Sequence, residues 1–201
     1  MEAVVGSEEG KEERAVPGIT DLGNVCKHIA RYNLSLLYAD KKRVLDAACG
    51  SGYGSFLVST VATSVVAVDI ASPAIEYAKK HYASPKIDHR LGDAASIQCD
   101  VELVVSFETI EHIQNISEFE EMIYRCLTPG GKIIYSLPLN EQPGFNPYHR
   151  HVFTFDTARK IFPRFAVREE LIQHGINFYS PKQLPLTQPW LAYIGVAEKL
   201  G

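Results

Sequence analysis

The chain has 201 residues, of which 46% are hydrophobic and 22% charged, and its net charge at pH 7 is −4. This length suits one α/β domain with a buried core and is too short for two full domains. No apolar run approaches the ~20 residues that cross a bilayer. Because Lys and Arg are also scattered, we expect neither a membrane nor a nucleic acid as partner.

Cysteines are spread along the chain without C-x-x-C spacing, at positions 26, 49, 99 and 126. Such spacing excludes a cysteine zinc site and gives no sign of a disulfide framework. We therefore expect reduced thiols and a cytoplasmic protein.

The N-terminal residues 1–16 are rich in Glu and Gly and have little apolar periodicity, so we expect a mobile arm there and a single domain over 17–201. Residues 19–38 follow as an amphipathic helix. Strands and helices then alternate, with strands expected over 42–47, 64–70, 87–91, 102–106 and 132–137 and helices over 53–59, 72–82 and 116–126. This alternation predicts right-handed βαβ crossovers and a parallel sheet covered on both faces.

After residue 139 the pattern changes. A loop rich in Pro, Gly and Asn over 140–148 leads to an expected helix near 155–162. Two strand-like runs, 166–172 and 190–198, complete the pattern. No internal repeat or linker interrupts the chain, which again indicates one domain.

A glycine-rich turn follows the first expected strand and reads Asp46-Ala47-Ala48-Cys49-Gly50-Ser51-Gly52-Tyr53-Gly54. Its G-x-G-x-G spacing differs from the G-x-G-x-x-G of dinucleotide folds. Asp46 would repel a pyrophosphate but could accept from an ammonium group, and Asp69, at the end of the next strand, could accept from both hydroxyls of a ribose. The turn therefore indicates a nucleoside with a zwitterionic tail, although an Asp at a strand end can also simply cap a helix.

The segments VLDAACGSGYG, VVAVDIA, LGDAASI and CLTPGGKIIYS resemble four motifs of the class I S-adenosylmethionine-dependent methyltransferases, over roughly residues 25–160. The resemblance implies an α/β, Rossmann-like fold whose seven-stranded, mostly parallel sheet ends in a C-terminal antiparallel hairpin. It implies S-adenosylmethionine as cofactor and S-adenosylhomocysteine as product, with Asp93 receiving the adenine amino group and Ala94 bordering the ring. The cofactor-binding residues that it implies are Arg31, Asp46, Ala48, Gly50, Gly52, Tyr53, Asp69, Ile70, Asp93, Ala94 and Phe107. Arg31 and Tyr32 could close over the cofactor carboxylate or could be an ordinary exposed pair on a helix.

The fourth expected strand is followed by three side chains with ligand atoms. Glu108, Glu111 and His112 stand at i, i+3 and i+4, so a helical turn would place all three on one face. Carboxylates with one imidazole suit a divalent cation such as Mg²⁺ or Mn²⁺. The spacing thus indicates a metal site beside the methyl donor.

This E-x-x-E-H pattern, with a later histidine before an aromatic-Thr pair, resembles the metal-dependent 2′-O-methyltransferases of small RNAs and the metal-binding ubiquinone-biosynthesis O-methyltransferases. Aligned on the pair Phe153-Thr154, the resemblance makes His149 the matching histidine and His151 the second choice. The metal ligands that it implies are Glu108, Glu111, His112 and His149, and the catalytic residues are Glu111, His112, His149 and His151.

A bound cation would lower the pKa of an acceptor hydroxyl and orient it, while a histidine outside the metal site could take the proton. The alternative is a metal-free enzyme, in which the glutamate caps a helix or holds the cofactor and His112 acts as the base alone. Both interpretations fit the spacing of Glu111 and His112.

The segments ACGSGYGS, SFETIEHI and NPYH-x-H-x-FT are similar to a branch of small glycan-associated (type 11-like) O-methyltransferases, encoded beside or fused to glycosyltransferases. This resemblance implies O-methylation of a sugar hydroxyl, with rhamnose as one candidate, and a glycosyltransferase as partner. Phe145, Tyr148 and Phe153 could stack on the sugar or anchor their loop.

Other functions remain open. Within the same enzyme class, the acceptor could be a small molecule of quinone or lipid metabolism, or the 2′-hydroxyl of RNA. A nucleotide-binding oxidoreductase is disfavoured by the glycine spacing and by Asp46. A catalytically silent binding module is disfavoured by the intact Glu108, Glu111 and His112.

Overall fold

The computed structural model describes residues 14–200. Its strands are β1 (Arg43–Ala47), β2 (Ser64–Asp69), β3 (Ile87–Leu91), β4 (Val101–Phe107), β5 (Leu127–Pro138), β6 (Phe165–His174), β7 (Asn177–Tyr179) and β8 (Leu191–Lys199). Its helices are α1 (Leu22–Ala39), α2 (Tyr53–Ser59), α3 (Ser72–His81), α4 (Ile116–Cys126) and α5 (Phe155–Ala158), with the short 3-10 helices η2 (Ala94–Ser96) and η3 (Ile110–His112). The alternation expected from the sequence is confirmed up to β5.

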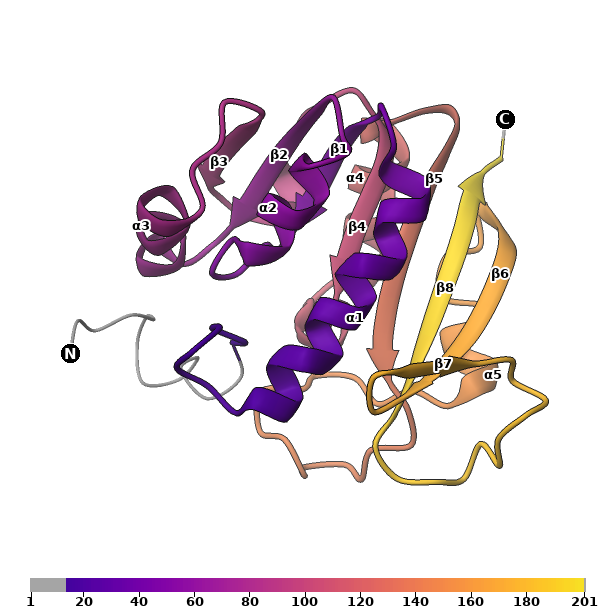
Figure 1. Ribbon diagram of the computed structural model, residues 1–201. Helices are drawn as coiled ribbons and strands as arrows, with labels where there is room; N and C mark the ends of the chain where they lie inside the picture. The colour runs from indigo at the N-terminus through magenta and orange to yellow at the C-terminus, as the bar shows by residue number, and fades with distance from the viewer. Residues whose placement is uncertain (1–13, 201) are drawn as a thin grey trace.

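The strands form one eight-stranded sheet in the order β3-β2-β1-β4-β5-β8-β6-β7 (Figure 1). The first five of these strands pair in parallel, and β8 runs antiparallel between β5 and β6. This arrangement confirms the Rossmann-like class I methyltransferase fold with its C-terminal antiparallel hairpin. The expected number of seven strands is one too low, because the chain turns at Gly175 and Asn177–Tyr179 pairs with the end of β6.

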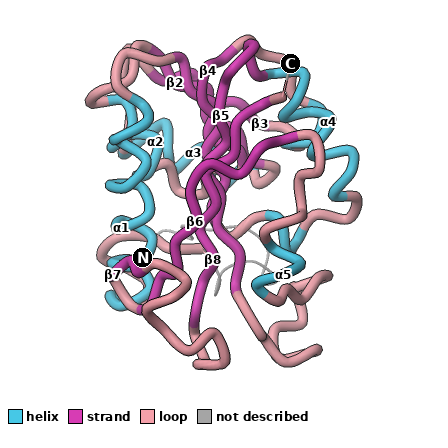
Figure 2. Tube along the Cα trace, turned by 90° about the vertical axis from the view of Figure 1, so that its right-hand side faces the viewer, coloured by secondary structure: helices cyan, strands magenta, loops and turns pink. Residues whose placement is uncertain are grey.

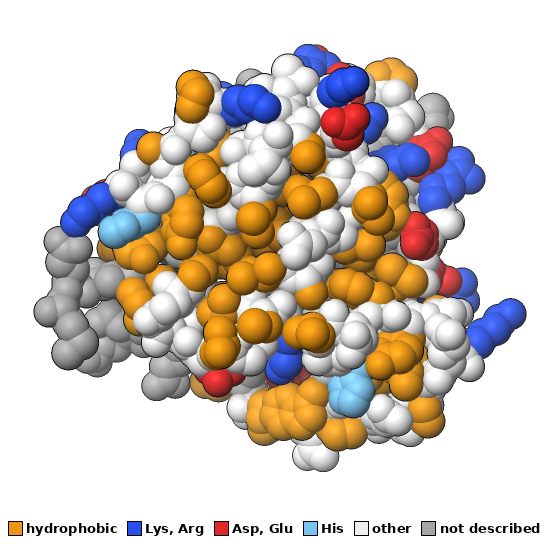
Figure 3. Space-filling view, viewed as in Figure 1, with side chains coloured by type: hydrophobic (Ala, Val, Ile, Leu, Met, Phe, Trp, Pro, Cys, Tyr) orange, Lys and Arg blue, Asp and Glu red, His pale blue; other side chains and the backbone are white. Residues whose placement is uncertain are grey.

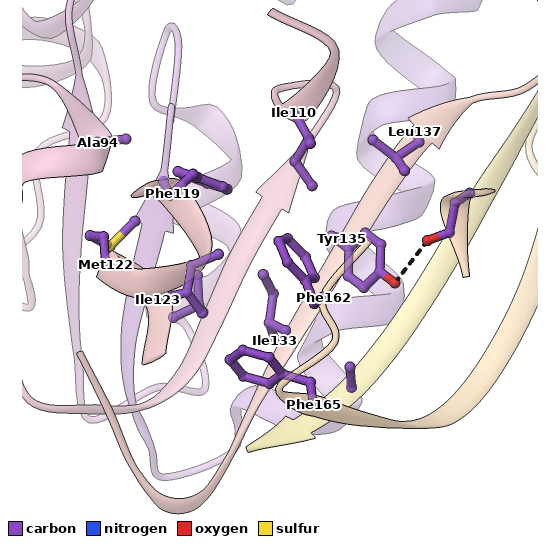
Figure 4. Packing of buried hydrophobic residues seen from close by; sticks show 14 of the residues in the cluster. Ala94, Ile110, Phe119, Met122, Ile123, Ile133, Tyr135, Leu137, Phe162 and Phe165 are labelled. Atoms are coloured by element: carbon purple, nitrogen blue, oxygen red, sulfur yellow. Dashed lines mark hydrogen bonds between the residues drawn. The ribbon is translucent and has the colours of Figure 1, made fainter. Parts of the chain in front are cut away.

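Helices cover both faces of the sheet. Figure 2 shows the sheet on edge, with α1 and α2 on one side and α4 and α5 on the other. Alternate residues of a strand therefore reach different cores: Ile133 packs with Phe119 and Met122 of α4, whereas Ile134 packs with Val25 of α1. The first of these cores also holds Tyr135, whose hydroxyl donates to the Ala158 carbonyl at 3.4 Å (Figure 4). No helix within residues 14–200 is long and apolar enough to cross a membrane.

Two predicted elements have different bounds in the structure. The helix expected over 155–162 ends at Ala158. After it the chain turns more tightly, since the Lys160 and Ile161 N–H groups donate to the carbonyls of Thr157 and Ala158, three residues back. The strand expected from residue 132 begins at Leu127. The intervening residues form a bulge against β4, where the pairing shifts from Val101–Leu127 to Leu103–Lys132.

The predicted arm over 1–16 lies mostly outside the described residues. Its described part packs on the domain: Val16 is fully buried, and the Ser51 hydroxyl donates to the Ala15 carbonyl at 3.0 Å. Arg14 lies 3.3 Å from the Asp69 carboxylate. Residues 14–16 therefore pack against the domain at the glycine turn, and the boundary at residue 16 stays a prediction.

Candidate active site

A cavity of about 780 Å³ opens where the parallel strands end, at the lower edge of the sheet in Figure 1. Its wall comes from the segment before α1, from α1, from the glycine turn, and from the loops after β2, β4 and β5. The sequence-predicted residues that line it are Arg31, Ala48, Gly50, Tyr53, Asp69, Ile70, Asp93, Ala94, Phe107, Glu108, Glu111, His112 and His149. Asp46, Gly52 and His151 are not among its lining residues.

The glycine turn is tight enough to need left-handed backbone at several positions. The φ angle is 67° at Ala48 and 86° at Gly52. A Cβ on Gly52 would lie 2.5 Å from the Cβ of Ala78, so glycine at this position lets α2 pack against α3. Gly52 therefore shapes the cavity by placing the turn, whereas Ala48 lines it directly.

Asp69 is held at the end of β2 by hydrogen bonds from the backbone. Its Oδ2 accepts from the Gly50 N–H at 2.8 Å, and its Oδ1 accepts from the Ala71 N–H at 2.9 Å. Arg14 also donates to Oδ1, at 3.3 Å. Since each carboxylate oxygen can accept two bonds, a diol that replaced Arg14 could donate to both oxygens of Asp69.

Asp46 is fully buried behind the cavity wall. It accepts from the Ser55 hydroxyl at 2.6 Å and from the Tyr32 hydroxyl at 3.2 Å. Its carboxyl group ties α1 and α2 to the end of β1, because Tyr32 and Ser55 stand on those two helices. A contact between Asp46 and an ammonium group of the ligand stays a prediction.

The buried Asp46 makes stability depend on pH. Burial raises the pKa of Asp46 to about 7, although hydrogen bonds from Ser55 and Tyr32 oppose the shift. The pKa of an unfolded aspartate is about 3.9. Protonated Asp46 therefore contributes its full stability below about pH 4, and this contribution is lost as pH rises through about 7.

Between pH 5 and pH 8 the unfolding free energy of the wild type should thus fall because of Asp46. We expect the fall to be smaller in Asp46→Asn by on the order of 2 kcal/mol. Urea unfolding of both proteins at the two pH values measures this difference; parallel profiles would contradict it.

Arg31 stands at the cavity wall in a network that joins α1 to the sheet. Only 4% of the residue is exposed. Its Nε donates to Gln173 of β6, and its Nη1 lies 3.4 Å from the Glu108 carboxylate. Gln173 in turn donates to the Lys27 carbonyl at 3.0 Å. The guanidinium is thus fixed in position and offers a buried positive charge to the cavity.

Glu108 is a partner of Arg31 and lies outside the histidine cluster. Burial alone would raise the pKa of Glu108, but the positive charge of Arg31 and further contacts hold it below its usual range. Its backbone is left-handed, with φ at 49°, and the Ser136 hydroxyl donates to its Oε1 at 2.7 Å. Helical geometry begins only with η3, at Ile110. This corrects the expectation that Glu108 shares a helical face with Glu111 and His112.

The remaining predicted ligands converge. Glu111, His112 and His149 each offer a ligand atom, and these atoms lie within 4.8 Å of one another. The two histidine rings meet edge to face, with centroids 4.8 Å apart. His112 Nδ1 lies 3.1 Å from the Tyr148 carbonyl; because a carbonyl can only accept, Nδ1 carries the proton and Nε2 the lone pair. Two imidazoles and a carboxylate fit Mn²⁺ or a similar transition ion better than Mg²⁺, which prefers oxygen ligands.

The loop after β5 fixes His149. The Arg150 N–H donates to the Glu111 carbonyl at 2.8 Å, which ties the loop to η3. Glu141 contacts His149 Nδ1, and the Asn146 amide donates to Nε2 at 3.0 Å, a bond that a cation at Nε2 would replace. A carboxylate behind a histidine orients the ring and raises its basicity.

His151 contacts the segment after η3. Its Nε2 donates to the Ile113 carbonyl at 2.8 Å, and the residue is not among those that line the cavity. His149 is the loop histidine that reaches the cavity, and a catalytic role for His151 stays a prediction.

The residues that line the cavity without having been assigned to it from the sequence include His28, Glu141 and Trp190. Burial and the nearby Arg31 lower the pKa of His28 to about 4, so its ring is neutral at pH 7. Its position three residues before Arg31 on α1 is a helical signal that could have identified it. Glu141 and Trp190 carry no local signal, since only the folded loops bring them to the cavity.

The sequence of this chain is similar to known methyltransferases. Residues 45–135 match the family described as "Methyltransferase domain". A Mycolicibacterium smegmatis protein named a probable S-adenosylmethionine-dependent methyltransferase is 31% identical over 147 residues, which cover 68% of this chain and 56% of that protein. The mitochondrial ubiquinone biosynthesis O-methyltransferase of Schizosaccharomyces pombe is 29% identical over 102 residues, covering 47% of this chain and 37% of the yeast protein. Residues 45–135 thus resemble this methyltransferase family, and the chain spans about half the length of the mycobacterial relative and less of the yeast one.

Solved structures share the fold. The N-methyltransferase NodS of Bradyrhizobium japonicum, in complex with S-adenosylhomocysteine, has a TM-score of 0.70 at 14% identity, with 90% of this chain and 89% of NodS covered. A TehB-like S-adenosylmethionine-dependent methyltransferase of Corynebacterium glutamicum has a TM-score of 0.64 at 19% identity, with coverage of 85% and 88%. At these identities the likeness shows the fold alone.

Proposed function

We propose that this protein transfers the methyl group of S-adenosylmethionine to a sugar hydroxyl of a glycan. The match of residues 45–135 to a methyltransferase domain supports the methyl transfer, as does the similarity to a protein named a probable S-adenosylmethionine-dependent methyltransferase. Rhamnose is one candidate acceptor, and a divalent cation assists. The observation that carries the proposal is one continuous cavity, lined by Asp69 and Asp93 as well as by Glu111, His112 and His149. A nucleoside site and a cluster able to activate a hydroxyl thus share one space.

The cofactor half of the proposal uses the groups that follow β1, β2 and β3. Asp69 would accept from the ribose hydroxyls in place of Arg14. Ile70 and Ala94 would border the adenine ring, and Asp93 would accept from its amino group. Arg31, which now lies 3.4 Å from the Glu108 carboxylate, would also attract the carboxylate of the cofactor.

The reacting half uses the histidine cluster. A divalent cation held by Glu111, His112 and His149 would lower the pKa of the acceptor hydroxyl and orient its oxygen. Glu141 holds the ring of His149 through Nδ1, so the cluster keeps its shape when the acceptor enters. In the metal-free alternative, the lone pair on His112 Nε2 takes the proton as the oxygen attacks the methyl carbon.

A small phenolic acceptor is the second candidate, and the similarity to ubiquinone biosynthesis O-methyltransferases favours it. RNA is less well supported. On the face drawn in Figure 3, Lys and Arg side chains lie around the rim and do not gather in one patch, whereas RNA-binding surfaces are usually basic. A glycosyltransferase partner and a cytoplasmic location stay predictions from the sequence.

The test is transfer of labelled methyl from S-adenosylmethionine to rhamnose-containing oligosaccharides, catechols and small RNAs, with Mn²⁺, Mg²⁺ or EDTA. We expect label on the sugar with Mn²⁺, a loss of at least about tenfold with EDTA, and recovery when Mn²⁺ is restored. Binding of S-adenosylhomocysteine, measured by thermal shift, should not change with EDTA. Full activity in EDTA would show that no cation assists the reaction. Label on catechol or RNA alone would show that the acceptor is not a sugar.

A further inference from the structure

Two large aromatic side chains stand exposed at the cavity. Phe145 is 61% exposed and Trp190 is 68% exposed, and both line the cavity. They come from different loops, one after β5 and one before β8, yet their ring centroids lie 5.5 Å apart at an interplanar angle of 69°. Water-exposed aromatic surface is costly, so a pair of rings held together in this way indicates a surface that a ligand covers.

The backbone of Trp190 supports the same interpretation. Its φ is 63°, in the left-handed region that a bulky residue avoids. Such conformations persist where the surrounding structure enforces them, and they cluster at ligand-binding positions. Here the next residue, Leu191, begins β8, and its carbonyl accepts from the Leu139 N–H at 2.9 Å. The strand end therefore holds the strained residue in place and presents its ring.

Polar side chains stand around the same space. Gln114, Asn146 and Arg150 line the cavity, and amide and guanidinium groups are the usual partners of hydroxyls. Phe153, the other aromatic of the loop, is only 6% exposed and packs in the core, so it anchors the loop. An aromatic platform beside amides suits a ligand with an apolar ring face and hydroxyls at its edge.

We propose that Phe145 and Trp190 form the acceptor subsite and stack against the apolar face of a pyranose ring; this rests on the function proposed above and names the sugar-recognition surface within it. Phe145 lies four residues before His149 in the chain, a stretch that spans at most about 14 Å. The subsite is thus within one or two sugar rings of the cluster that activates the hydroxyl.

Trp190 is the one tryptophan of the chain, so its fluorescence reports on the subsite directly. With S-adenosylhomocysteine bound, titration with methyl α-L-rhamnopyranoside or a rhamnose-terminated oligosaccharide should shift the emission to the blue and saturate. Phe145→Ala should weaken sugar binding as measured by this emission shift. The control variant Phe56→Ala removes an exposed aromatic side chain outside the cavity and should leave the shift unchanged.

A second test measures the kinetics of the variant Trp190→Gly. Glycine adopts positive φ without strain, so the melting temperature should not fall, whereas loss of the stacked ring should raise KM for the sugar about tenfold. The kcat should stay within about twofold, because the ring does not touch the reacting atoms. Trp190→Phe keeps a ring and should recover most of the affinity.

The outcomes separate this subsite from the proposed function. Sugar methylation with an unchanged KM in Trp190→Gly would overturn the subsite and leave the function standing. An emission shift with catechol and none with either rhamnoside would overturn the pyranose assignment. If the protein binds S-adenosylhomocysteine but labels no sugar, the proposed function is wrong. If the emission of Trp190 does not shift to the blue with any of the probes, the subsite is wrong.

Discussion

Replacing Glu111 by Gln is expected to lower kcat for methyl transfer on the order of 100-fold. Gln keeps the shape of this fully buried side chain and removes the one negative charge in the group formed with His112 and His149. Without that charge, the proposed divalent cation would bind weakly and would no longer lower the pKa of the acceptor hydroxyl. Single-turnover transfer of labelled methyl, with Mn²⁺ at saturating and limiting concentrations, measures the effect.

The control variants locate the cause. His112→Gln should lose activity whether the histidine holds a cation or acts alone, whereas Glu111→Gln should be severe only if a cation takes part. His81→Gln replaces an exposed histidine at the end of α3, outside the cavity, and should change neither kcat nor cofactor affinity. If Glu111→Gln retains kcat within about threefold while His112→Gln does not, the metal-free mechanism is the correct one.

The largest effect on stability is expected from Gly54→Ala. A Cβ on Gly54 would lie 2.0 Å from Cζ of Tyr32, whose ring is buried between α1 and α2 and bonded to Asp46. Neither the ring nor the helix backbone can move freely, so we expect a loss of about 3 kcal/mol in unfolding free energy. For a chain of this size that loss lowers Tm by roughly 6–12 °C, as differential scanning calorimetry would show.

A matched glycine provides the comparison. A Cβ added to Gly92 would meet open space, with nothing within 4 Å, and the φ of Gly92 is not positive. Gly92→Ala should therefore change the unfolding free energy by less than about 0.5 kcal/mol. Because Gly54→Ala also displaces the wall formed by Tyr32 and Tyr53, affinity for S-adenosylhomocysteine should fall with stability. Equal melting temperatures for Gly54→Ala and Gly92→Ala would contradict the prediction, because they would show that α1 and α2 accommodate the added Cβ at little cost in free energy.

Much of the fold was readable from local signals. The helix predicted over 116–126 has the same bounds in the structure, because the Asn115 side chain caps it and an apolar face repeats along it. The alternation of strands and helices predicted the parallel sheet, and Gly50 with Asp69 predicted the place of the cavity. These features depend on residues close together in sequence or on a periodicity that one element carries by itself.

The roles of individual acids and histidines needed the tertiary structure. Asp69 is the last residue of a parallel strand and Asp46 the last but one, and nothing local predicts their different surroundings. The packing of α1 over β1 buries Asp46 under Tyr32 and leaves Asp69 at the cavity. In the same way, the left-handed φ of Glu108 breaks the helical turn that was expected from its spacing to Glu111 and His112.

The sequence by itself therefore determined the fold class, the glycine turn and the set of residues from which a site could be built. Only the tertiary structure decided which of them meet, because the contacts of His112 with His149 and of Phe145 with Trp190 join segments that are far apart in the chain. Such contacts depend on strand order and loop closure, which involve groups distant in the chain and leave no periodicity in it.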